Sequence, residues 1–140
     1  MIAYVDTSAL VKLYVSEVGS PEAREKLDRA DSLATSLVTY VEVRAAIARR
    51  AREGDVSRGA KDELLSMLEA DWEHYAVVGV SDPLCRLAAK LCHRHPLRGV
   101  DALHLASALT VKVQSGQPDM FLCFDERLRS AAHEEGLLMD

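Results

Sequence analysis

Four acidic residues stand where a carboxylate would be available for chemistry: Asp6, Glu42, Asp101 and Asp125. Asp6 and Asp125 directly follow short apolar runs, and Asp101 begins the apolar segment 100–109. Carboxylates that are brought together repel one another and raise each other's pKa unless a cation neutralises them. Because hard divalent cations prefer oxygen ligands and the chain offers no matching set of soft ligands, Mg²⁺ or Mn²⁺ is the expected ion.

Each of these acids also has an ordinary structural explanation. Asp6 and Asp125 would serve as helix caps, worth about 1 kcal/mol each. Asp101 would lie in the first turn of its helix, where the helix dipole stabilises an anion by roughly 0.3 to 1 kcal/mol. Glu42 would pair with an arginine on an exposed helix face. Asp101 fits this reading least well, because its helix is apolar on nearly every side and a buried charge needs a partner.

The elements that must position these acids follow from the apolar pattern. Strands are predicted at residues 1–5, 32–35, 75–80 and 120–124, with a short fifth strand at 137–139; helices are predicted at 9–14, 20–30, 36–52, 57–72, 82–96, 99–113 and 125–135. Such alternation favours an α/β fold in three layers, α/β/α, around a central, mostly parallel sheet of four to five strands. Ligands of open α/β sheets gather at the carboxyl ends of the strands, where Asp6 and Asp125 are expected.

Composition fits one folded domain over residues 1–140, since 49% of the residues are apolar and 28% are charged. Three cysteines without an export signal argue against a disulfide framework, and we expect all three to be small core residues. Cys92, His93 and His95 form a cluster for which zinc is a minority interpretation beside a polar helix end stopped by Pro96. The absence of a secretory signal and of a membrane-length apolar run predicts a cytoplasmic protein.

The formal net charge of −5 argues against a general nucleic-acid coat protein, because nonspecific binding depends on lysine and arginine displacing counterions from phosphate. Any nucleic-acid role must therefore be local. Basic residues do gather in two regions: Arg44, Arg49, Arg50, Arg52, Arg58 and Lys61 in the first, and Arg94 and Arg98 in the second. The default interpretation of such runs is a solvated helix face, unless they line a site.

Four segments resemble the PIN-domain family in their order and spacing. They are residues 6–14 (Asp-Thr-Ser-Ala-Leu-Val-Lys-Leu-Tyr), 41–43 (Val-Glu-Val), 100–106 (Val-Asp-Ala-Leu-His-Leu-Ala) and 124–128 (Phe-Asp-Glu-Arg-Leu). The resemblance covers essentially the whole chain and is closest to VapC-type toxins of bacterial and archaeal toxin–antitoxin pairs. The family often has Thr or Ser two residues before the last acid, where this chain has Cys123, a poorer hydrogen-bond donor.

The resemblance implies a ribonuclease in which Asp6, Glu42, Asp101 and Asp125 bind one or two divalent ions, directly or through water. It also implies that Ser8 orients Asp6 or a bound water, with helix capping as its alternative role. Such ions make hydroxide from bound water and stabilise the leaving oxygen, so phosphodiester hydrolysis needs no side-chain nucleophile. We give His104 no catalytic role, because a histidine in an apolar helix is more often a packed core residue.

Arg44 and Arg98, near Glu42 and Asp101 in sequence, are candidates to hold phosphate beside the metals. By the same resemblance the expected partners are an RNA substrate, a second copy of the chain in a homodimer, and a VapB-like antitoxin. Binding of the antitoxin would convert the homodimer into a larger hetero-oligomer.

Two other classes of protein compete with this reading. A haloacid-dehalogenase-type phosphatase needs a second aspartate two residues after the first, where this chain has Ser8. A phosphotransfer receiver domain needs acids before Asp6, where Tyr4 and Val5 stand. The third alternative is a catalytically inactive PIN fold that only binds a partner; the presence of all four acids argues against it, and an assay decides it.

Overall fold

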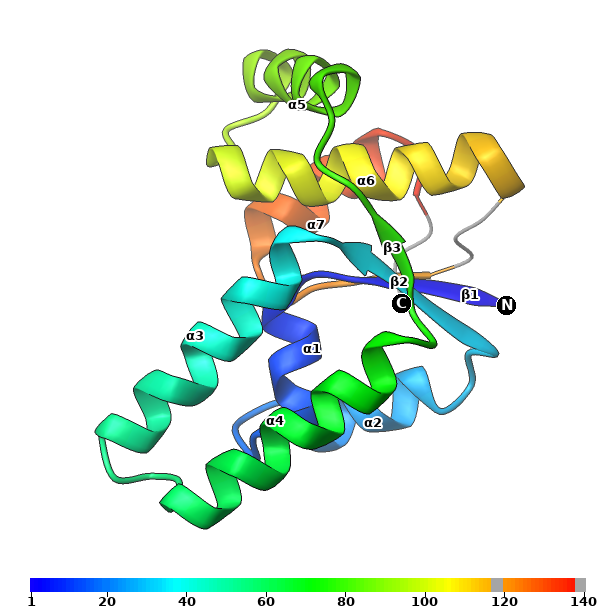
Figure 1. The fold of residues 1–140 in the computed structure, drawn as a ribbon. Helices are drawn as coiled ribbons and strands as arrows, with labels where there is room; N and C mark the ends of the chain where they lie inside the picture. Colours follow the sequence, from blue (N-terminus) through cyan, green and yellow to red (C-terminus); the bar gives the residue numbers. More distant parts are fainter. Residues whose placement is uncertain (117–119, 138–140) are drawn as a thin grey trace.

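The computed structural model describes residues 1–116 and 120–137, which form four strands and seven helices (Figure 1). The strands are β1 (Ile2–Val5), β2 (Ser32–Ser36), β3 (Ala76–Val78) and β4 (Met120–Leu122). The helices are α1 (Thr7–Tyr14), α2 (Ser20–Leu27), α3 (Val38–Arg52), α4 (Arg58–Trp72), α5 (Asp82–Arg94), α6 (Gly99–Ser115) and α7 (Glu126–Glu134). The predicted alternation of strands and helices is confirmed.

The strands form one sheet in the order β3-β2-β1-β4, and every pairing is parallel. The carboxyl ends of β1 and β4 therefore open on the same edge, with Val5 opposite Leu122. The predicted fifth strand at 137–139 lies mostly outside the described residues, and Leu137, which is described, is buried without belonging to a strand.

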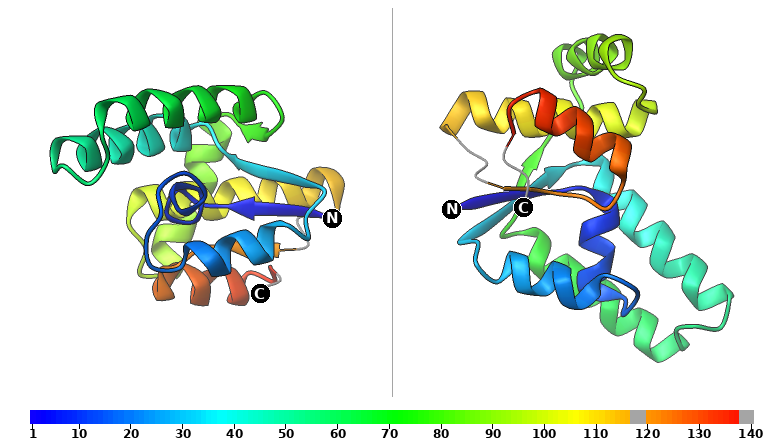
Figure 2. Two further views of the ribbon diagram at one scale, coloured as in Figure 1. Left: turned by 90° about the horizontal axis from the view of Figure 1, so that it is seen from below. Right: turned by 180° about the vertical axis from the view of Figure 1, so that it is seen from behind.

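Helices cover both faces of the sheet, as the two views in Figure 2 show. Successive side chains of a strand point to opposite faces, so Ala3 and Val5 pack among α1 to α4, whereas Tyr4 packs among α5, α6 and α7. On the second side α6 lies against the sheet, and α5 packs on the outside of α6 (Figure 1). This two-deep packing is why α6 is buried on nearly every side.

Several element ends differ from their predicted positions. β3 covers only Ala76–Val78 instead of 75–80, because it pairs with β2 alone and the chain beyond Val78 has no strand to follow. α2 ends at Leu27, three residues early. α6 runs two residues past its predicted end, to Ser115, and is stopped by Gly116, which takes the left-handed conformation. Within the described ranges no helix is long and apolar enough to span a membrane.

The expectation of three core cysteines is wrong for two of them. Cys123 is buried, but Cys85 and Cys92 are exposed on α5. α5 presents Leu84, Ala88 and Leu91 to α6, so the cysteines, seven residues apart, share its solvent side.

One member of the proposed cluster at the end of α5, His95, contacts two glutamates. The Nε2 atom of His95 lies 2.8 Å from Glu135, and its Nδ1 atom lies 3.3 Å from Glu134. Over the described parts of the chain no group of three His, Cys, Asp or Glu side chains is arranged to hold a metal ion, so the zinc interpretation gains no support.

Candidate active site

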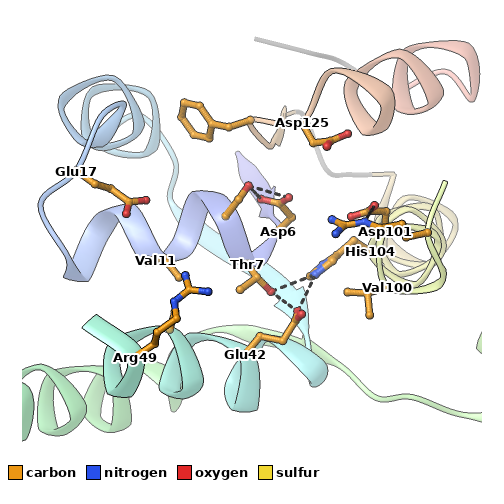
Figure 3. Close-up of a pocket in the computed structure, with 14 residues that line it drawn as sticks. Asp6, Thr7, Val11, Glu17, Glu42, Arg49, Val100, Asp101, His104 and Asp125 are labelled. Atoms are coloured by element: carbon orange, nitrogen blue, oxygen red, sulfur yellow. Dashed lines mark hydrogen bonds and ion pairs between the residues drawn. The ribbon is translucent and has the colours of Figure 1, made fainter. Parts of the chain in front are cut away.

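A cavity of about 440 Å³ opens at the carboxyl edge of the sheet, and all four predicted acids line it (Figure 3). Asp6 follows β1, Glu42 projects from the second turn of α3, Asp101 lies in the first turn of α6, and Asp125 precedes α7. Parallel strands bring these elements to one edge, so residues separated by up to 119 positions meet.

Asp6 is the N-cap of α1, and its side chain is held from two directions. Its Oδ1 atom accepts hydrogen bonds from the Ala9 amide at 2.9 Å and from the Ser8 hydroxyl at 2.7 Å. Only 5% of Asp6 is exposed, and this burial raises the pKa of its carboxyl, as does the neighbouring charge of Asp101. Ser8 therefore orients Asp6, and the capping role predicted as its alternative belongs to Asp6 itself.

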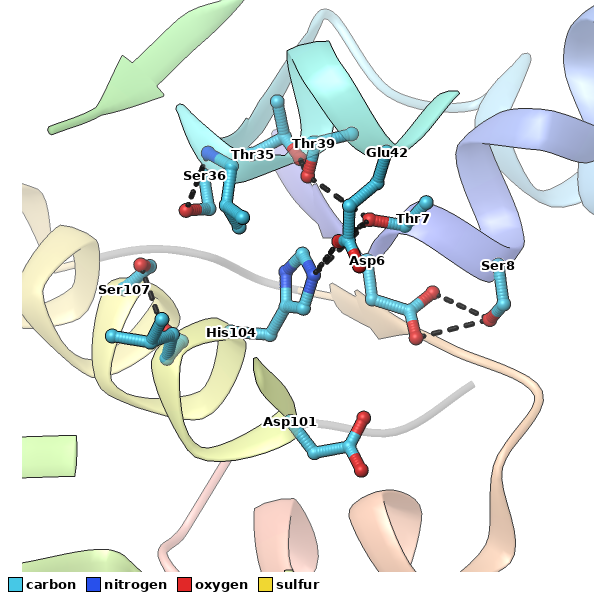
Figure 4. A network of polar contacts seen from close by, with 12 residues as sticks. Asp6, Thr7, Ser8, Thr35, Ser36, Thr39, Glu42, Asp101, His104 and Ser107 are labelled. Carbon is cyan, nitrogen blue, oxygen red and sulfur yellow. Dashed lines mark hydrogen bonds and ion pairs between the residues drawn. The ribbon is translucent and has the colours of Figure 1, made fainter. Parts of the chain in front are cut away.

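Glu42 belongs to a polar network with Thr7 and His104 (Figure 4). The Thr7 hydroxyl donates to its Oε1 atom at 2.5 Å, and His104 Nε2 lies 3.5 Å from the same oxygen. His104, followed by Thr7, lowers the pKa of Glu42 against the opposing effect of burial. Glu42 is thus stabilised as a carboxylate, a role for which the sequence offered no partner except an arginine.

His104 is 2% exposed, and both of its ring nitrogens have partners. Nδ1 shares a hydrogen bond of 3.0 Å with the Tyr4 hydroxyl, and Nε2 lies 3.3 Å from the Thr7 hydroxyl. The histidine is packed and hydrogen-bonded, as expected, but it also connects β1 to Glu42. Its position within an apolar helix gave no signal for that connection, which depends on how α6 lies across the sheet.

Asp101 has the partner that its burial requires. Arg98, three residues earlier, donates from Nε to Oδ2 of Asp101 at 3.0 Å. The Asp101 side chain is 12% exposed and that of Arg98 is 80% exposed, so the pair spans from the cavity wall to solvent. A mostly solvated arginine satisfies the charge without closing the cavity.

Asp125 caps α7 and accepts a hydrogen bond from the Leu128 amide at 3.0 Å. Cys123 points its Sγ atom at the backbone oxygen of Asp125, 3.8 Å away, and so supports the chain rather than the carboxylate. Burial raises the pKa of the Cys123 thiol to about 12, which keeps it protonated at neutral pH. Although Cys123 stands where the family often has Thr or Ser, the Asp125 side chain is still oriented by the first turn of α7.

The two arginines proposed to hold phosphate are placed differently. Arg98 lines the cavity, but Arg44 does not: its guanidinium lies over the Tyr40 ring at 5.3 Å and 3.4 Å from Glu69. Arg49 lines the cavity instead. Its spacing of seven residues from Glu42 puts both on one face of α3, a signal that was available in the sequence.

A family model described as PIN domain matches residues 3–134 of the chain. The chain belongs to the PIN-domain family. This PIN domain is 38% identical over 140 residues to ribonuclease VapC45 of Mycobacterium tuberculosis, with 96% of this chain and 92% of that protein covered. The predicted resemblance to the PIN and VapC group is confirmed.

Solved structures share the fold of this PIN domain. VapC20 of M. tuberculosis, a toxin that cleaves the sarcin–ricin loop, matches with a TM-score of 0.69 and 20% identity over 97% of this chain and 96% of that one. A toxin–antitoxin complex from Klebsiella pneumoniae matches with a TM-score of 0.61 and 21% identity over 86% of this chain and 96% of that one. At these identities the likeness establishes the α/β architecture with its parallel sheet.

Because the pKa of Glu42 is lowered in the folded state, we expect Glu42 to make a pH-dependent contribution to the stability of this PIN domain. Its folded-state pKa is lowered, so the stabilisation is complete above the unfolded-state pKa and is lost as the pH falls through the folded-state value. In EDTA, the thermal midpoint of the wild type should exceed that of Glu42→Gln at pH 7, and the difference should narrow below about pH 4.

Circular dichroism melts between pH 7 and pH 3 measure this difference. Glu53→Gln, an exposed substitution at the end of the same helix and outside the cavity, is the control. A difference between wild type and Glu42→Gln that stays constant with pH would contradict the assignment of a stabilised carboxylate.

Proposed function

We propose that this chain is an endoribonuclease that hydrolyses RNA phosphodiester bonds with Mg²⁺ or Mn²⁺, and that it is the toxin of a toxin–antitoxin pair. The observation that carries the proposal is the meeting of four carboxylates in one cavity of a PIN domain. A relative that is 38% identical across nearly the full length of both chains is named a ribonuclease, which supports the reaction class.

The donor set fits a hard divalent cation. The cavity is lined by carboxylates and hydroxyls, it has no thiol in its lining, and the nitrogens of His104 are occupied. Burial and the charge of Asp101 both disfavour the ionised form of Asp6, and a cation would offset that cost. Mg²⁺ usually keeps several of its waters and is held by one or two carboxylates, a requirement that this lining can meet.

Asp6, Glu42, Asp101 and Asp125 would hold the ions, directly or through water. A bound ion lowers the pKa of water and stabilises charge on phosphate oxygens. The chain's own contribution is orientation: Ser8 and the Ala9 amide fix Asp6, and the Leu128 amide fixes Asp125. No side chain of the cavity is needed as a nucleophile.

Partners follow from the same proposal. A folded toxin needs an inhibitor, and the K. pneumoniae structure that shares this fold is a toxin–antitoxin complex. We therefore expect a VapB-like antitoxin that covers the acidic cavity, and a homodimer that joins a larger assembly when the antitoxin binds. The RNA target would be single-stranded, since bases are read where they are unstacked.

Metal removal tests the proposal. Purified protein freed of any copurifying inhibitor should cleave RNA in Mg²⁺ or Mn²⁺, lose this activity in EDTA and regain it when the ion is restored. Mn²⁺ at 100 times its dissociation constant should also stabilise the folded protein by about 2.7 kcal/mol, measured as a rise in thermal midpoint. Stabilisation by Mn²⁺ without cleavage would favour the alternative, an inactive PIN fold that only binds a partner.

A further inference from the structure

Arg49 is a cation in the cavity wall that has no acidic partner among the described residues. It is exposed, it projects from α3 toward the cavity (Figure 3), and it forms no ion pair within those parts of the chain. Two other arginines of the same helix are paired, Arg44 with Glu69 and Arg50 with Glu17. Arg49 is therefore the case that the interpretation of the basic run left open, an exposed arginine that also lines a site.

Glu17, another acid that lines the cavity, is already paired with two cations. Lys12 binds the Glu17 Oε1 atom at 2.8 Å, and Arg50 binds the Oε2 atom at 3.0 Å. Both carboxylate oxygens thus have a cation, and Glu17 leaves Arg49 its full charge. The cavity consequently has an acidic end and a basic end.

The two ends are separated along α3. Arg49 follows Glu42 by seven residues, which is about 10 Å along a helix axis. Val11 and Ala46 line the wall with them and offer no polar group to Arg49. At this distance from the acids, the guanidinium would bind a different anion from the one that lies beside the metal ions.

We propose that Arg49 binds a backbone phosphate adjacent to the scissile phosphate of a single-stranded RNA. This inference rests on the proposed function. The planar guanidinium binds phosphate through two parallel hydrogen bonds, and a chain with net charge −5 has to attract RNA through local cations. Arg49 would be a positioning residue: it places the strand in register with the acids and touches no reacting atom.

Arg49→Gln should lower kcat/KM for a short RNA about 10- to 100-fold, the loss expected for one charge-assisted hydrogen-bonded contact. Arg49→Lys should recover part of this activity, since it keeps the charge and loses the paired geometry. The matched control is Arg52→Gln, three residues further along α3 and outside the cavity lining, which should change kcat/KM by less than about twofold.

Binding supplies a readout that does not need cleavage. In the Asp101→Asn background, the logarithm of the RNA association constant should fall with the logarithm of salt concentration, and adding Arg49→Gln should reduce that slope by about 0.7, the value for one phosphate contact on a single strand. An equal slope in the Arg49→Gln and Arg52→Gln backgrounds would overturn the proposal. If the slope falls but the wild type cleaves no RNA, the phosphate contact stands and the ribonuclease proposal fails.

Uncharged methylphosphonate linkages locate the contact. Once the cleaved bond of an oligonucleotide is mapped, one uncharged linkage is placed immediately before or after it. The wild type should lose about 10-fold or more in kcat/KM at one of these positions, whereas Arg49→Gln should lose little further, because its contact is already absent. Equal sensitivity of both proteins at both positions would place Arg49 elsewhere than on an adjacent phosphate.

Discussion

Asp101→Asn and Asp6→Asn should each reduce RNA cleavage by about 10³-fold or more, because each removes a charge that the metal-assisted reaction requires. The substitution keeps the shape of the side chain and one oxygen acceptor. The Ala9 amide and Ser8 hydroxyl that bind Asp6 can still donate to the carbonyl oxygen of the substituted side chain, so we expect the fold to survive. The measurement is single-turnover cleavage of a labelled RNA in saturating Mg²⁺.

Asp82→Asn is a control for the position in the helix and for the arginine partner. Asp82 and Asp101 both lie in the first turn of a helix and both pair with an arginine, Arg86 at 2.7 Å and Arg98 at 3.0 Å. Only Asp101 lines the cavity. Cleavage should therefore be unchanged in Asp82→Asn, and full activity in both cavity variants would eliminate the proposed metal site.

Asp6→Asn should also make the metal-free protein more stable. The folded-state pKa of Asp6 is raised by burial, so its charged form at neutral pH opposes folding and a neutral amide does not. In EDTA at pH 7 the thermal midpoint of the variant should lie above that of the wild type. Addition of Mn²⁺ should reverse the order, since only the wild type retains all four carboxylates. A variant that melts lower in EDTA would contradict the assigned cost of burying this charge.

His104→Ala should destabilise the domain by about 3 kcal/mol, because it opens a cavity at a site that is 2% exposed and removes a buried partner of the Tyr4 hydroxyl. The thermal midpoint should fall by about 10 °C. Well below that temperature, cleavage should fall only about 10- to 100-fold, less than in Asp101→Asn, because Glu42 loses an orienting neighbour but no carboxylate is removed.

A double-mutant cycle with Tyr4→Phe isolates the hydrogen bond. The phenylalanine ring would keep the stacked contact with Phe121, whose ring centroid lies 5.4 Å away, and should cost about 1 kcal/mol. If the two residues are coupled, the double variant should be less destabilised than the sum of the single variants by about 1 kcal/mol. Strict additivity would show that the hydrogen bond between Tyr4 and His104 does not support the fold, and a His104→Ala midpoint equal to that of the wild type would show the same of His104 as a whole.

The sequence by itself determined the order of the elements and the parallel character of the sheet. Apolar runs followed by capping residues, as at Asp6 and Asp125, are local patterns, and local patterns are sufficient to predict a strand that passes directly into a helix. The four motif segments were also sufficient to predict the PIN family, which the match over residues 3–134 confirms. The ends of β3 and α6 were predicted less well, since pairing and packing extend or shorten an element beyond its local preference.

The tertiary structure alone decided which side chains share an environment. Cys85 and Cys92 were expected in the core and lie in solvent, because α5 covers α6 with its other face. Arg44 and Arg49 are five residues apart on α3, yet only Arg49 lines the cavity. The contact between His104 and Glu42 joins residues 62 positions apart, and its geometry follows from the way α3 and α6 cross opposite faces of the sheet. Residue type and local spacing specify each element, but a site made of several elements depends on how their packed faces turn the side chains toward one another.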